Sequence, residues 1–144
     1  KEIAKRNWLR RKQSPQLPCF NVIDQFYFRK LNNEILGKPK SANDARDTLK
    51  RLSGTKHEVI SAVCMVHNGK TIEFKDSTRI EFKLLSTTEI DYYVNNYKPF
   101  DKAGSYGIQE WIGHIAVSKI EGSYTNVMGL PTQALYKEIE KLKN

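Results

Sequence analysis

The chain has 144 residues and a mass of 16.7 kDa, enough for one domain with a hydrophobic core but not for two of ordinary size. Hydrophobic residues make up 39% and charged residues 28%, and no apolar run approaches the roughly 18 residues of a membrane span, which excludes a membrane-spanning class. The formal net charge is +8, and six of the first twelve residues are basic, so a polyanionic partner is favoured: a nucleotide, a nucleic acid or an acidic membrane surface.

The first third of the chain alternates extended and broken segments. Residues 1–13 predict a basic helix, which the prolines of "SPQLPC" end. Aromatic and β-branched residues from Cys19 to Phe28 predict a strand, and the adjacent asparagines of "LNNE" predict a turn after it. "GKPKS" then indicates a loop that carries two lysines.

The helix after this loop has the clearest boundaries. Ser41 and Asp44 have the spacing of a capping box, and Gly54 stands where a C-terminal cap belongs. Its apolar face is predicted to consist of Ala45, Leu49 and Leu52.

The middle of the chain predicts a sheet. Residues 58–66, "EVISAVCMV", are apolar at almost every position, which predicts a strand buried on both faces and helices that cover it. Asn68 and Gly69 are the pair that a type I′ hairpin needs, and residues 71–83 alternate like an antiparallel strand with one wet face. The expected class is therefore α/β.

The last third is predicted to be helix, loop, strands and helix. Ser86 and Glu89 form a second capping box, and that helix should end near Pro99. Residues 114–129 predict a strand, a glycine turn and a further strand or loop, and Pro131 suits the first turn of a closing helix. Three residues of the closing helix are expected to face inward: Leu135, Ile139 and Leu142.

The histidines and cysteines show no catalytic or metal-binding pattern. His57, His67 and His114 are isolated from one another, at no ligand spacing. Cys64 lies in the apolar strand, and Cys19 has no nearby histidine, so cysteine chemistry is not expected. The two cysteines lie far apart with no metal-type spacing, and together with the lack of a secretory leader pattern this favours a cytoplasmic location.

Two loops could bind an anionic ligand. Lys38 precedes the helix that begins near Ser41, so its ammonium and the free N–H groups of that helix could meet on one phosphate. The alternative is that Gly37 and Pro39 shape a turn and Lys38 is a solvated charge.

The second loop is "DKAGSYGIQEW". Lys102 supplies a cation, Gly104 and Gly107 allow close backbone approach to a ligand, and the amide of Gln109 can both donate to and accept from a base edge. The alternative is a glycine-rich connection in which Asp101 caps a short helix and Gln109 is a surface amide.

Four motifs resemble one family in order and spacing: "ILGKP", "SGTKHEVISAV", "DKAGSYGIQ" and "IEGSYTNVMGLP". From about Leu31 to Leu142 the chain is similar to the C-terminal two-thirds of the Maf family of nucleotide pyrophosphatases. The resemblance implies an α/β fold with an elongated mixed β-sheet flanked by helices, like that of the inosine-triphosphate pyrophosphatases and N-terminally truncated here. It implies a single domain over residues 1–144, with residues 1–30 divergent from the family pattern.

The resemblance also implies an activity. Family members split a nucleoside triphosphate into the monophosphate and pyrophosphate with a divalent metal, Mg²⁺ or Mn²⁺, and often form homodimers. "YGIQ" followed by "GSYTNVMGLP" resembles the branch that acts on dTTP and UTP. Carried over by motif, Lys38 and Lys102 match the lysines that handle the phosphates, with Lys102 taken as catalytic, and Gln109 matches the glutamine of base choice.

The N-terminal part departs from the family pattern. The family's Ser-x-Ser-Pro-Arg-Arg phosphate loop is not reproduced, and Lys12 is the only substrate-binding candidate in that segment. The family's general base would fall on Phe26; Asp24 could replace it if the strand carried a local insertion. Either a shifted reading frame in the gene or true divergence would explain why residues 1–30 depart from the family pattern.

The alternative function is an inactive remnant of the fold that binds nucleotide or nucleic acid, although no nucleic-acid-binding signature supports the binding of nucleic acid.

Overall fold

A computed structural model describes residues 21–142 of the chain, and for residues 21–25 it describes the backbone alone. The helix predicted over residues 1–13, Cys19 and Lys12 lie outside the described residues. The strands are β1 Asn21–Leu31, β2 Glu34–Leu36, β3 Lys56–His67, β4 Lys70–Phe82 and β5 Val117–Glu121. The helices are α2 Ala42–Leu52, α3 Thr87–Tyr97, α4 Trp111–Ala116, α5 Tyr124–Met128 and α6 Thr132–Lys141, with a 3₁₀ turn η1 at Ala103–Ser105.

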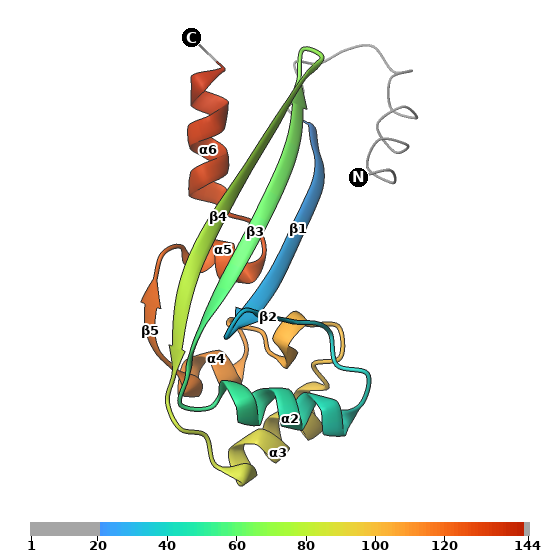
Figure 1. Cartoon of the computed structure of the whole chain (residues 1–144), viewed down its shortest axis with the longest axis vertical. Coiled ribbons are helices and arrows are strands. Elements are labelled where there is room, and N and C mark those ends of the chain that lie inside the picture. Colours follow the sequence, from blue (N-terminus) through green and yellow to red (C-terminus); the bar gives the residue numbers. More distant parts are fainter. Residues whose placement is uncertain (1–20, 143–144) are drawn as a thin grey trace.

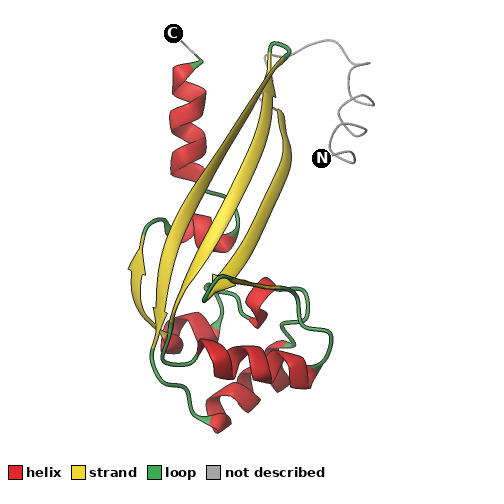
Figure 2. Cartoon of the chain, viewed as in Figure 1, coloured by secondary structure: helices red, strands yellow, loops and turns green. Residues whose placement is uncertain are grey.

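The described part of the chain is elongated, in agreement with the predicted elongated β-sheet. Figure 1 shows the long strands β1, β3 and β4 rising from a base of helices that contains α2, α3 and α4. The helices α5 and α6 lie beside the sheet, and Figure 2 shows the other helices gathered at the base of the long strands. The α/β class with an elongated sheet and flanking helices is therefore confirmed.

The sheet of the described residues is antiparallel throughout rather than mixed. Its strand order is β2-β1-β3-β4-β5, and every neighbouring pair runs antiparallel. Tight turns make two of these pairs antiparallel, β1 with β2 and β3 with β4. In the second turn Asn68 and Gly69 both have positive φ, as a type I′ hairpin requires.

The strand expected to be buried on both faces is buried on only one. Along β3, alternate residues are buried, but Ala62 on the other face is exposed and its neighbours there are half-buried. An antiparallel sheet needs helices on one face only, so that prediction was wrong about the second layer. The buried face of β3 consists of His57, Val59, Ser61, Val63 and Met65.

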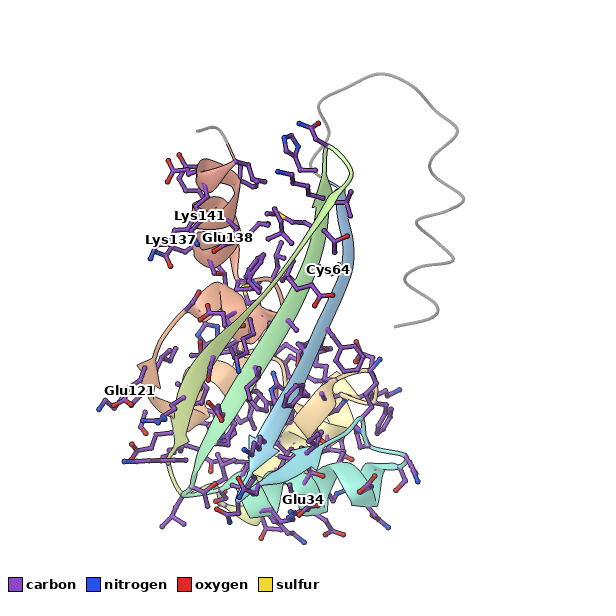
Figure 3. The ribbon with its side chains drawn as sticks, turned by 45° about the horizontal axis from the view of Figure 1, so that its top comes forward. Glu34, Cys64, Glu121, Lys137, Glu138 and Lys141 are labelled. Carbon is purple, nitrogen blue, oxygen red and sulfur yellow. The ribbon has the colours of Figure 1, made fainter. Side chains whose placement is uncertain are left out.

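Helices α2 and α3 follow their predicted caps. The hydroxyl of Ser41 accepts from the N–H of Asp44, and α3 has a complete capping box between Ser86 and Glu89. In α2 the carboxylate of Asp44 instead accepts from the N–H of Lys40, so its box is not reciprocal. The predicted inward residues of α2 are fully buried. A side-chain ion pair between Arg51 and Glu34 joins α2 to β2, and Figure 3 labels Glu34 beside α2.

The C-terminal third corrects three predictions. Residues 114–116 belong to helix α4 and not to a strand, which begins only at Val117. The segment after Gly122 is a short helix, α5, and not a strand or loop. In α6 the three residues expected to face inward are only half-buried, and this helix lies beside the upper part of the sheet, away from the helical base. No helix in residues 21–142 combines the length and apolarity that a membrane crossing needs.

Candidate functional site

The two loops singled out in the sequence meet in the structure. The N–H of Gly104 donates to the carbonyl of Gly37 over 2.9 Å, which ties "DKAG" to "GKP". The side chain of Lys38 is exposed, yet it is close enough for its charge to help lower the pKa of Asp101. The strongest cause of that lowering is the hydrogen bond that Asp101 accepts from Lys102. Lys38, Asp101 and Lys102 therefore belong to one electrostatic neighbourhood.

A cavity of about 130 Å³ opens next to these loops. Its lining combines cationic, amide and apolar groups: Tyr27, Arg29, Asp101, Lys102, Tyr106, Gly107, Gln109, Val127 and Met128. Ligand pockets for whole small molecules usually exceed roughly 300 Å³, so this cavity would hold one part of such a ligand rather than all of it. Lys38 and Gly104 do not line it.

Lys102 is held by two carboxylates. Its Nζ lies 3.0 Å from an oxygen of Asp101 and 3.1 Å from an oxygen of Glu110. Burial acts to lower the pKa of Lys102, but the two carboxylates outweigh it and the pKa is raised. Lys102 is thus a fixed cation at neutral pH.

Glu110 is held in place by a hydrogen bond from Tyr93. The hydroxyl of Tyr93 donates to Glu110 and accepts from the N–H of Gly107 over 3.1 Å. Burial, and then the hydrogen bond to Glu110, raise the pKa of Tyr93, so the phenol remains a donor. Neither Tyr93 nor Glu110 was identified from the sequence, because the contact joins helix α3 to a loop.

Arg29 is the largest omission of the sequence analysis. Only 2% of its surface is exposed, and its guanidinium carbon lies 3.6 Å from the centre of the Tyr106 ring. One terminal nitrogen donates to the carbonyl of Tyr106 over 2.6 Å and to that of Ala103. The available signal was its position two residues before the apolar Leu31, on the same face of the strand.

Gly104 is needed for packing against Arg29 and not for contact with the cavity. Its φ is +67°, and a Cβ there would lie 2.7 Å from the Cδ of Arg29. Asp101 caps no helix, since η1 begins after Lys102 without a side-chain cap. Gln109 is exposed in the turn formed when the N–H of Glu110 donates to the carbonyl of Gly107.

His57 lies behind the cavity wall as a neutral core residue. It is 3% exposed, its ring packs edge-on against Phe82 and Tyr106, and a ring nitrogen lies 2.7 Å from the Tyr106 hydroxyl. Burial, and then the charge of Arg29, lower its pKa to about 3. A group that stays neutral in this way is structural.

This depressed pKa predicts how stability depends on pH. Between the unfolded pKa near 6.5 and the folded value of about 3, the unfolded chain binds a proton that the folded chain does not. Stability conferred by neutral His57 is therefore full above pH 6.5 and decreases as pH falls, by about 2 kcal/mol from pH 7 to pH 5. Urea unfolding of the protein and of His57→Gln at both values tests this; an equal pH dependence in the two proteins would contradict it.

The remaining predicted site residues are placed as follows. Phe26, at the family's base position, is 68% exposed and does not line the cavity. Asp24 pairs with Cys64 through the backbone of β1 and β3, and the pairing is irregular between Val22 and Asp24. Among the described side chains, no three of His, Cys, Asp or Glu are grouped to hold a metal ion.

The chain is thus an α/β protein in which an antiparallel sheet stands on a helical base, with a cavity near their junction whose lining includes two cations, Arg29 and Lys102. The chain belongs to the Maf-like protein family, whose sequence model matches residues 12–142.

Comparison with individual proteins gives relatives whose names agree with one another. The chain is 54% identical over 110 residues to a dTTP/UTP pyrophosphatase of Flavobacterium johnsoniae, covering 76% of this chain and 57% of that protein. It is 54% identical over 112 residues to a dTTP/UTP pyrophosphatase of Phocaeicola vulgatus, covering 78% and 58%. A dTTP/UTP pyrophosphatase of Flavobacterium psychrophilum is 57% identical over 106 residues, covering 74% and 54%. The matched region is thus a little over half the length of these relatives.

Proposed function

We propose that this protein hydrolyses dTTP and UTP to the monophosphate and pyrophosphate, in the cytoplasm and as a homodimer. The observation that carries the proposal is the hydrogen bond between Gly104 and Gly37, which joins the two loops that bear Lys38 and Lys102. Two cations on adjoining loops suit a triphosphate, and the exposed amide of Gln109, which lines the cavity together with Lys102, suits a base edge. The names of the relatives support pyrimidine triphosphates as substrates.

A divalent metal, Mg²⁺ or Mn²⁺, is part of the proposal. Mg²⁺ is commonly bound by one or two carboxylates together with the substrate's own phosphates, which supply most of the oxygen ligands. Asp101 lines the cavity and is largely exposed, so its carboxylate fits such a role. The metal would neutralise charge on the phosphates.

Hydrolysis also needs a group that takes a proton from water, and Asp24 is our proposed base. It could replace the residue at position 26 only if β1 carried a local insertion. The irregular pairing between Val22 and Asp24 is consistent with that condition. Lys102, fixed by Asp101 and Glu110, would stabilise negative charge on the reacting phosphate.

A second function, binding without hydrolysis, is favoured by one observation. At the position of the family's base this chain has Phe26, whose exposed ring cannot accept a proton. Such a protein would retain the cations and the amide of the cavity, and would hold a nucleotide without cutting it.

The test is pyrophosphate release by the purified full chain from dTTP, UTP and GTP with Mg²⁺ or Mn²⁺. We expect release from the two pyrimidine nucleotides, and we expect Gln109→Ala to reduce their advantage over GTP by about tenfold. Ser118→Ala, an exposed position on β5 away from the cavity, is the control and should change nothing. Calorimetric binding of dTTP without pyrophosphate release would support the second function. If the protein neither binds dTTP nor releases pyrophosphate from it, both functions are refuted.

A further inference from the structure

Arg29 has a buried positive charge that no carboxylate among the described side chains balances. Within the described residues it forms no ion pair, and its partners are the neutral carbonyls of Ala103 and Tyr106 and the ring of Tyr106. Its Nε is buried and has no hydrogen-bond partner there. Burying a charge without a counter-ion is costly, and a buried donor left unpaired adds to that cost.

The same side chain lines the cavity. Arg29 and Lys102 both contribute to its wall. The nearby carboxylates, Asp101 and Glu110, are bound to Lys102, so they do not balance Arg29. An anion in the cavity would supply the counter-charge that the described part of the protein does not provide.

We propose that Arg29 is a substrate-binding residue whose guanidinium pairs with phosphate oxygens of the nucleotide, opposite Lys102. This inference rests on the proposed function for the identity of the anion. A guanidinium is suited to the role because its donors are held in a planar fork that matches phosphate geometry. Stacking on Tyr106 and the two carbonyl contacts fix that plane before the ligand arrives.

Arg29 also shapes the loop, and the experiment must separate the two roles. Its contacts with Ala103 and Tyr106, and the close packing of Gly104, hold residues 103–106 against β1. A purely structural residue would lower stability when replaced, whereas a substrate-binding cation would change affinity and its dependence on salt.

The experiment measures binding of inorganic pyrophosphate and of dTTP to the full chain by calorimetry, at two salt concentrations. Arg29→Met removes the charge but keeps much of the length, and should weaken both ligands by about tenfold or more and reduce the salt sensitivity of binding. Its melting temperature should fall, because the buried carbonyls of Ala103 and Tyr106 lose their donor, so binding is measured well below that temperature. Arg29→Lys should restore part of the affinity.

The matched control is Arg79→Met, because Arg79 is exposed on β4 and does not line the cavity. Unchanged pyrophosphate affinity in Arg29→Met, or no binding of pyrophosphate by the unmodified protein, would overturn the inference. If the protein turns over dTTP and Arg29→Met does so equally well, the inference fails while the proposed function stands. If pyrophosphate binding depends on Arg29 but no turnover occurs, only the hydrolytic function fails.

Discussion

Replacing Lys102 with methionine is expected to lower kcat/KM for dTTP about 100-fold, because it removes a preorganised cation from the cavity. The loss should exceed that of a surface lysine for a structural reason. Lys102 separates Asp101 from Glu110, so its removal leaves two carboxylates unopposed beside the proposed phosphate site. Steady-state kinetics with Mg²⁺ would measure the effect, with Lys119→Met, an exposed lysine on β5, as the matched control.

A double variant distinguishes the two ways in which Lys102 could act. If Lys102 only neutralises its neighbours, adding Glu110→Gln to Lys102→Met should restore most of the activity. If Lys102 contacts the reacting phosphate, the double variant should remain about as slow as the single one. We expect the second outcome, and full recovery would contradict a catalytic role for Lys102.

Local patterns were enough to predict much of the fold. The hairpin at Asn68 and the capping box at Ser86 depend on residues within four positions of each other, and both were found in the structure. The predicted apolar face of α2 is also found in the structure, because it follows from the spacing of apolar residues within that one helix.

The errors lie where distant contacts decide the structure. Helix α5 is held by Asn126, whose amide donates to the carbonyl of Val59 over 3.2 Å and to the hydroxyl of Thr78 over 2.9 Å. Both acceptors lie on strands far away in the sequence, so β-branched residues and a glycine suggested another strand instead. Helix α4 was missed for a related reason, because its isoleucines also favour strands.

The candidate site divides in the same way. Lys38, Lys102 and Gln109 stand in short motifs that a reader of the sequence can pick out, although their roles stay predictions. The partners of Arg29 and Glu110 are seen only when β1 and α3 are brought against the loop at residues 101–110. Charge balance in the cavity is therefore a property of the tertiary structure and not of any motif.

The loop that carries Gln109 depends on one close backbone approach. The carbonyl of Ile108 lies so near to Gly113 that a Cβ at Gly113 would be 1.8 Å from its oxygen and 2.5 Å from its carbon. Both atoms belong to buried backbone, which cannot move aside as a flexible side chain could. Only glycine allows α4 to begin this close to the turn formed by residues 107–110.

Gly113→Ala is accordingly expected to destabilise the protein by about 3 kcal/mol or more, because the turn or the helix must shift to relieve the overlap. Urea unfolding of the full chain at pH 7 would measure it. Gly37→Ala is the matched control: a Cβ at Gly37 would meet no atom within 4 Å, so its stability should change by no more than about 0.5 kcal/mol. Equal stabilities for the two variants would show that the approach of Ile108 to Gly113 does not constrain the loop. If Gly113→Ala remains folded, its affinity for dTTP should fall with its stability, since the turn that bears Gln109 is displaced.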